Sequence, residues 1–396
     1  MLRILLISAF IFTATLFSFS QSNDFLTEEE LEDAVVYTDL DDALKNTAEV
    51  YILDLSSQGL TKLPKEVSRF RNVQIVILSD NQLTEIPAEL TKLKKLQVLR
   101  IDSNNIETLY FDTSDPRNFQ SLESIYVGFN PIKTIPENIK NIDLGLVSLS
   151  GCKYLDINKI FTSLAAIKSL DYLDLSYLNL DTIPWEVANL YGLRTLDLSA
   201  NPSMDWDTSM RFLSQNKSIE ELILHNNRFS TITEEFSRFE NLHSLDLSYN
   251  DKLSIKQVFE VTKNCKQLNT IDLSFCQLRE LPKSIGDQKK LFELYLSHNR
   301  LSRIPGEIGL LEQLELVDLS FNELTELPEQ FGDLQSLEYL LLGNNPLEFL
   351  PRNMSNLNDI KYVELPKDSL DKQVKKSLKD IFSKAEIVFI KGEEDN

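Results

Sequence analysis

The side chains that catalyse most enzyme reactions are scarce in this chain. It has three histidines, His225, His243 and His298, and none has a cysteine or serine at a matching position that could act as a nucleophile. No glycine-rich phosphate loop, zinc signature or dinucleotide-binding fingerprint occurs, and the chain has only 11 glycines. We therefore expect no catalytic residues, no metal site, no cofactor and no enzymatic activity.

A second group of side chains has the composition of a binding surface. Aromatic rings provide contact area at a small entropic cost, and fixed carboxylates select partners by charge. The predicted binding residues are Tyr126, Phe129, Tyr172, Asp174, Tyr177, Asp197, Asp246, Tyr249, Asp272, Phe275, Tyr295, Asp318 and Phe321. The aspartates have an alternative interpretation, in which they are motif consensus and support strand packing. Neighbouring carboxylates such as Asp246 and Asp272 could also hold a cation, although no single loop has the spacing of a calcium site.

These residues recur because the chain is a tandem repeat. The skeleton LxxLxLxxNxL returns every 22 to 26 residues, and a truncated copy begins at Ile360. The thirteen full copies begin at Val50, Val73, Leu96, Leu122, Leu144, Leu170, Leu193, Ile219, Leu242, Leu268, Leu291, Leu314 and Leu337. A fixed period in this range is typical of a solenoid, in which stacked units share one apolar core.

Each unit predicts a short strand followed by a return across the core. In residues 314–336 the alternation around Val317 and Leu319 indicates a strand with one buried face. Short repeats continue into a turn that contains proline, such as Leu327-Pro328, and we expect extended backbone there. Three of the four 26-residue repeats predict helices instead, at 159–167, 208–215 and 255–264. The sequence thus predicts an α/β solenoid with a parallel concave sheet and a mixed helical and extended convex side.

One position of the skeleton predicts a ladder of buried asparagines. An asparagine amide can satisfy backbone groups that would otherwise be buried without partners. The predicted ladder comprises Asn81, Asn104, Asn130, Asn201, Asn227, Asn250, Asn299, Asn322 and Asn345. Gln58, Cys152, Leu178 and Cys276 replace it in other copies. With Cys265, the two cysteines form an odd, sparse set that favours buried thiols over disulfides.

The two ends of the chain predict processing and capping segments. Residues 1–20 have the charge, apolar run and small residues of a secretory signal peptide, with an uncleaved anchor as the alternative. Residues 21–49 read as a helical cap, 50–365 as the repeat array, and 366–396 as a C-terminal cap with an acidic tail. We expect an exported protein that is periplasmic, on the cell surface or secreted.

The charge of the chain limits its partners. The formal net charge is -21, which disfavours nucleic acid and anionic membranes and suits basic or neutral protein surfaces. No apolar stretch beyond the N-terminal one is long enough to span a bilayer. We expect no nucleic-acid binding and no stable membrane insertion of the mature chain.

The repeats resemble those of leucine-rich-repeat proteins. Residues 314–331 and 271–285 follow the pattern LDLSxNxLxxLPxxI, with Cys276 at the asparagine position of the second. They look like the class shared by bacterial and Ras-suppressor-like proteins, and residues 39–46 are similar to the opening of exported repeat proteins from the Bacteroidetes. The resemblance implies a horseshoe with a curved parallel sheet used for protein recognition, and it implies no reaction.

Two functions remain open at this point. The first is a non-catalytic exported scaffold that binds a protein partner on its concave acidic and aromatic face. The alternative is a periplasmic or cell-surface module that stacks glycan rings on the same aromatic side chains. Salt should distinguish them, because only a charged partner loses affinity as ionic strength rises.

Overall fold

The computed structural model describes residues 25–391, which form parallel strands joined by short helices. Sixteen strands follow one another in the order of the chain. Equivalent residues of successive repeats stand opposite each other in parallel register, as Asp246 does with Asp272. The predicted α/β solenoid with a parallel sheet is therefore confirmed. The predicted signal peptide (1–20) and the acidic residues 392–396 lie outside the described residues.

The described chain divides into two compact units, and we describe each by itself. Unit 1 comprises residues 25–178 and 189–197, and unit 2 comprises residues 179–188 and 198–391. The short helix η5 (Trp185–Asn189) contains residues of both units.

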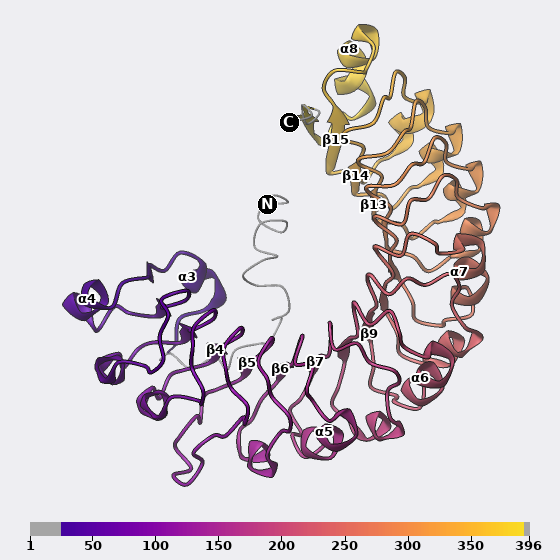
Figure 1. Cartoon of the computed structure of the whole chain (residues 1–396). Coiled ribbons are helices and arrows are strands. Elements are labelled where there is room, and N and C mark those ends of the chain that lie inside the picture. The colour runs from indigo at the N-terminus through magenta and orange to yellow at the C-terminus, as the bar shows by residue number, and fades with distance from the viewer. Residues whose placement is uncertain (1–24, 392–396) are drawn as a thin grey trace. The chain divides into compact units, whose positions relative to one another are not determined.

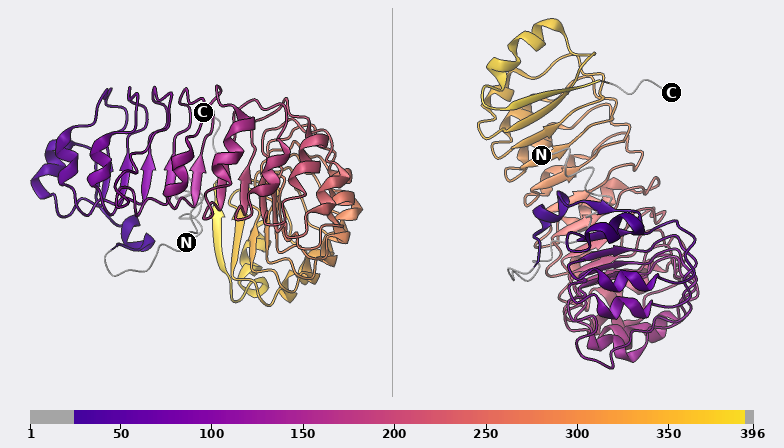
Figure 2. Two further views of the ribbon diagram at one scale, coloured as in Figure 1. Left: turned by 90° about the horizontal axis from the view of Figure 1, so that it is seen from below. Right: turned by 90° about the vertical axis from the view of Figure 1, so that its left-hand side faces the viewer.

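Unit 1 contains the first eight strands, which run side by side in Figure 2, left. Its strands are β1 (Val36–Tyr37), β2 (Ile52–Asp54), β3 (Ile75–Ile77), β4 (Val98–Arg100), β5 (Ser124–Tyr126), β6 (Leu146–Ser148), β7 (Tyr172–Asp174) and β8 (Thr195–Asp197). Its helices are α3 (Glu28–Glu32), α4 (Leu40–Ala43), α5 (Ile157–Leu164) and the 3-10 helices η1 (Leu44–Asn46), η2 (Lys65–Arg69), η3 (Ala88–Lys92) and η4 (Glu137–Asn141).

Unit 2 contains the last eight strands. These are β9 (Glu221–Ile223), β10 (Ser244–Asp246), β11 (Thr270–Asp272), β12 (Glu293–Tyr295), β13 (Leu316–Asp318), β14 (Tyr339–Leu341), β15 (Tyr362–Pro366) and β16 (Glu386–Ile390). Its helices are α6 (Trp206–Leu213), α7 (Ile255–Thr262), α8 (Lys372–Ile381) and the 3-10 helices η6 (Glu234–Arg238), η7 (Lys283–Asp287), η8 (Gly306–Leu310), η9 (Glu329–Asp333) and η10 (Arg352–Asn356). Within unit 2 the helices lie on one side of the strands (Figure 1).

The alternation of side chains along each strand gives the sheet two different faces. The central residue points into the apolar core and is fully buried, as Leu245 and Leu294 are. The flanking residues, such as Ser244 and Asp246, are half-buried on the opposite face. We call this face, which in unit 2 points away from the helices, the open face. It carries the positions that the repeat leaves free.

The helical side differs from the sequence expectation in the short repeats. Instead of continuing as extended backbone, the chain forms a five-residue 3-10 helix directly after proline, as η7 does after Pro282. Proline fixes its own φ, and a buried residue of the turn, Ile285 in η7, then anchors the segment to the core. The long repeats carry α5, α6 and α7 close to the predicted helices.

Both ends of the described chain add elements to the repeats, and Leu31 of α3 packs against Ile52 of β2 and Ile75 of β3. At the start, Thr27 caps α3 through a capping box with Glu30, and Asp39 caps α4 by accepting from the Asp42 backbone N–H at 2.8 Å. At the end, α8 precedes β16, which pairs in parallel with β15. The sheet gains β1 and β16 beyond the repeats counted in the sequence.

Candidate functional site

The open face of unit 2 carries a continuous stack of rings. Tyr249, Phe275, His298 and Phe321 each precede the asparagine position of their repeat. The ring centroids of Tyr249 and Phe275 are 4.2 Å apart, those of Phe275 and His298 4.1 Å, and those of His298 and Phe321 4.0 Å. The interplanar angles are 8°, 9° and 12°. We call these four residues the ring stack.

The backbone conformation of the turn aligns the ring stack. The four residues have φ between 52° and 58°, in the left-handed region that non-glycine residues seldom adopt. Repetition of one conformation in successive repeats places the rings in register, so that they stack along the sheet. Tyr249 is 51% exposed and His298 is exposed, while Phe275 and Phe321 are half-buried. The stack therefore presents ring edges to the solvent.

His298 was absent from the predicted binding residues. The predicted binding residues at this position are all tyrosines and phenylalanines, and the histidines were considered only as possible catalytic residues. The available signal was its place directly before Asn299, which is equivalent to the place of Phe275 before Cys276. Its imidazole is planar and fills one level of the stack between two phenylalanine rings.

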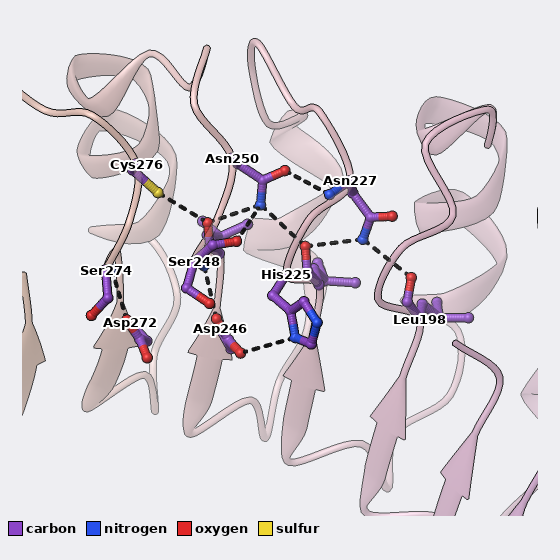
Figure 3. Close-up of polar contacts among 11 residues, drawn as sticks. Leu198, His225, Asn227, Asp246, Ser248, Asn250, Asp272, Ser274 and Cys276 are labelled. Carbon is purple, nitrogen blue, oxygen red and sulfur yellow. Dashed lines mark hydrogen bonds and ion pairs between the residues drawn. The ribbon is translucent and has the colours of Figure 1, made fainter. Parts of the chain in front are cut away.

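Buried asparagines fix the turns of unit 2, and Figure 3 shows the contacts of Asn227 and Asn250. The Asn250 side-chain Oδ1 accepts from the backbone N–H groups of Asn227 at 2.9 Å and Phe229 at 3.1 Å. Its Nδ2 donates to the carbonyl oxygens of Leu224 at 3.2 Å and Leu247 at 2.8 Å. All nine asparagines named in the sequence are buried: Asn81, Asn104, Asn130, Asn201, Asn227, Asn250, Asn299, Asn322 and Asn345.

Cysteine takes over part of this role where it replaces asparagine. The Cys276 thiol donates to the Leu247 carbonyl oxygen at 3.3 Å, and the Cys152 thiol donates to the Val127 carbonyl oxygen at 3.4 Å. Both are buried and free, as is Cys265. Burial raises the pKa of Cys152 to about 11 and those of Cys265 and Cys276 to about 12, which disfavours the nucleophilic thiolate form.

The aspartates of the open face have a local structural role. The carboxylates of Asp246 and Asp272 each accept from the backbone N–H of the serine two residues later, Ser248 and Ser274, at 2.8 Å (Figure 3). Asp318 accepts in the same way from Ser320 at 2.9 Å. This supports the interpretation that aspartate fixes the turn after the strand. It also holds each carboxylate in one orientation on the open face.

The carboxylates of unit 2 remain close to one another. Burial, followed by the negative charge of Asp246, raises the pKa of Asp272 to about 6. The Nδ1 atom of His225 lies 3.9 Å from Asp246 Oδ2, at the end of the row (Figure 3). Between the aspartates, Tyr295 occupies the equivalent position on β12 and its hydroxyl donates to Glu293 at 3.2 Å. We call Asp246, Asp272 and Asp318, which lie beside the ring stack, the acidic row.

The predicted aromatic binding residues of unit 1 do not form a stack like that of unit 2. Phe129 and Tyr177 are exposed, but Gly151 stands between them in the repeat order and their centroids are 6.2 Å apart at 48°. Tyr126 is half-buried on the open face, with the Arg100 guanidinium 4.5 Å from its ring centroid. Unit 1 therefore has paired contacts and no continuous stack like that of unit 2.

The remaining predicted residues of unit 1 lie on its last two strands. Tyr172 and Asp174 stand half-buried on β7, and Asp197 is half-buried on β8. The Ser148 hydroxyl donates to Asp174 at 2.6 Å.

In residues 25–391, no cluster of three His, Cys, Asp or Glu side chains is arranged to hold a metal ion, and no helix is both long and apolar enough to cross a membrane.

Comparisons with known proteins agree with this architecture. Residues 48–108 and 266–324 match the leucine rich repeat family. A stretch of 150 residues is 34% identical to a probable serine/threonine-protein kinase of Dictyostelium discoideum, covering 36% of this chain and 5% of that protein. The chain thus spans about a twentieth of the length of that relative.

Two solved structures show the same fold. A leucine-rich-repeat protein of Leptospira interrogans is 26% identical, with a TM-score of 0.53 over 90% of this chain and all of that chain. The Toll–Spätzle complex of Drosophila contains a chain that is 21% identical, with a TM-score of 0.56 over 87% of this chain and 48% of that one. The fold is thus that of a leucine-rich-repeat solenoid, and two segments of the chain carry the sequence signature of the leucine rich repeat family.

Proposed function

We propose that this protein is a non-catalytic, exported scaffold that binds a protein partner on the open face of unit 2. The ring stack is the observation that carries the proposal. Four rings stand in line, partly exposed, beside fixed carboxylates. Aromatic side chains held in one conformation bind with little loss of entropy, which is the property of interface anchors.

The comparisons support the binding class in general terms. The Drosophila chain that shares the fold comes from a complex of two named proteins, Toll and Spätzle. We further propose that the repeats belong to the bacterial and Ras-suppressor-like class, because residues 281–285 read LPKSI and the other short repeats of unit 2 carry close variants of LPxxI, such as IPGEI at 304–308. Export is inferred from residues 1–20, and N-terminal sequencing of the protein from its native host would test the expected cleavage after Ser20.

The geometry disfavours the glycan alternative on the ring stack. A sugar ring stacks on an exposed aromatic face, but both faces of Phe275 and of His298 are covered by neighbouring rings. The exposed ring edges carry partial positive charge and suit backbone carbonyls, carboxylates and the faces of other aromatic rings. A protein surface supplies these groups in greater variety than a neutral glycan.

Replacement of two rings tests the proposal. We expect the protein to capture a partner from extracellular and envelope fractions of its host, and Tyr249→Ala with Phe275→Ala to weaken that capture at least about tenfold. The matched control is Tyr110→Ala with Tyr154→Ala, which removes two exposed tyrosines of unit 1 that lie outside the strands. A glycan array run in parallel tests the alternative. Equal capture by the ring-stack variant and the parent would refute the proposal.

A further inference from the structure

A second surface of unit 2 lies on the strands themselves. Leu316, Tyr339 and Tyr362 occupy matching positions on β13, β14 and β15, where the register places them opposite one another. Tyr295 and Leu341 lie two residues further along β12 and β14, in the next row of the open face, where Asp318 stands between them. We call these five residues the β12–β15 floor. Leu341 is buried, and the other four are half-buried.

Carboxylates surround the β12–β15 floor. Glu293, Asp318 and Glu364 lie on the same strands, and Glu315 and Glu338 directly precede β13 and β14. Lys361 directly precedes β15, and its Nζ lies 2.6 Å from Glu338 Oε2. Burial and the charge of Asp318 raise the pKa of Glu364. The surface therefore combines an apolar centre with an excess of negative charge.

We propose that the β12–β15 floor binds a basic, amphipathic segment of the protein partner. The proposal rests on the proposed function and assigns its chemistry. Apolar side chains of the segment contact Leu316, Tyr339 and Tyr362. Lysine or arginine side chains of the segment pair with Asp318, Glu364 and the glutamates beside them.

Charge complementarity selects this partner over others. An acidic segment would add like charges beside Glu293, Asp318 and Glu364, and each such contact is repulsive. A neutral apolar segment would cover the floor but bury carboxylates without partners, which costs free energy. A basic amphipathic segment covers the floor and also supplies a counter-ion to each carboxylate that loses water.

Three labelled synthetic peptides of equal length test the chemistry. In the first lysine alternates with leucine, in the second glutamate replaces lysine, and in the third serine replaces leucine. Fluorescence anisotropy with the purified protein should show the first peptide binding at least about tenfold more tightly than either other. Its affinity should fall at least about tenfold between roughly 50 mM and 500 mM salt. Equal binding of the three peptides would overturn the proposal.

Two pairs of variants place the peptide on the floor. Tyr339→Ala with Tyr362→Ala should weaken binding of the lysine–leucine peptide at least about tenfold, with Tyr110→Ala and Tyr154→Ala as the control. Glu315→Gln with Glu364→Gln removes charge without removing side-chain volume and should weaken binding about tenfold. Its control is Glu312→Gln with Glu329→Gln, two exposed glutamates of unit 2 outside the strands.

The outcomes separate the two proposals. Circular dichroism checks that each variant folds, and the glutamine pair keeps the test valid if the alanine pair does not. If both floor pairs bind the peptide as the parent does, the β12–β15 floor is not the site. If partner capture still depends on Tyr249 and Phe275 in that case, the proposed function stands and this inference alone fails.

Discussion

At the scale of single residues, the repeat depends on side chains that satisfy the backbone. The Asn250 side chain accepts hydrogen bonds from two backbone N–H groups and donates hydrogen bonds to carbonyl oxygens of two repeats. Water cannot replace these bonds easily, because the amide is fully buried. The asparagine is therefore a structural residue, although its neighbour Tyr249 belongs to the candidate site.

Removal of this amide should destabilise the protein. We predict that Asn250→Ala lowers the free energy of unfolding by about 1–3 kcal/mol, because buried N–H and carbonyl groups lose their partners. Chemical denaturation measures this change. Asn105→Ala is the matched control, since Asn105 is exposed, and we expect it to leave stability nearly unchanged. Equal stability of the Asn250 variant and the parent would contradict the role of the ladder.

At the scale of elements, neighbouring strands bring like charges together. Asp246 on β10 and Asp272 on β11 are direct register partners, and Asp318 lies two strands beyond Asp272. Their carboxylates cap their own turns, so the strands hold them in place despite the repulsion. The ring stack and the acidic row thus arise from the same repetition of one strand and one turn.

The acidic row should make stability depend on pH. Because the pKa of Asp272 is raised to about 6 in the folded state, the folded protein binds a proton there more tightly than the unfolded chain does. The free energy of unfolding therefore falls as pH rises from about 4 to about 6, and this contribution is constant above that range. Asp272→Asn removes the charge and keeps an oxygen to accept from Ser274. We predict a gain of about 1–2 kcal/mol at pH 7.5 that shrinks toward pH 4.

Denaturation at several pH values measures this effect. Asp54→Asn serves as the control, because Asp54 accepts from Ser56 in the same way but stands opposite the uncharged Ile77. A gain for Asp272→Asn that is equal at pH 4 and pH 7.5 would show that charge is not its cause.

The sequence predicted some elements well and others poorly, for physical reasons. The helices α5, α6 and α7 follow apolar spacing that is local to the sequence, and their ends lie within three residues of the predicted bounds. The 3-10 helices after proline were expected as extended backbone, because the residue that closes each turn, such as Ile285, is fixed by packing against other repeats. His298 was missed because its function in the stack depends on shape and not on imidazole chemistry.

At the scale of the molecule, the period of the sequence was sufficient to predict the fold. Stacked units must share a core, so a regular leucine pattern allows few other architectures. The division into two compact units could not be seen in that pattern. Nor could the period indicate that rings form a continuous stack in unit 2 but not in unit 1. In unit 1 this position holds Phe129 and Tyr177 with Gly151 between them, and Ser57, Asp80 and Ser103 in earlier repeats.

The whole-molecule charge of -21 favours a basic partner, and the open face of unit 2 offers both anchors and carboxylates to it. The proposed function requires that a partner covers this face. Hydroxyl-radical footprinting of the protein with and without its captured partner tests this requirement. We predict that Tyr249, Phe275, His298 and Phe321 react in the free protein and are protected in the complex, while Tyr154 reacts equally in both. Protection confined to α6 and α7, with the ring stack still reactive, would contradict binding on the open face of unit 2.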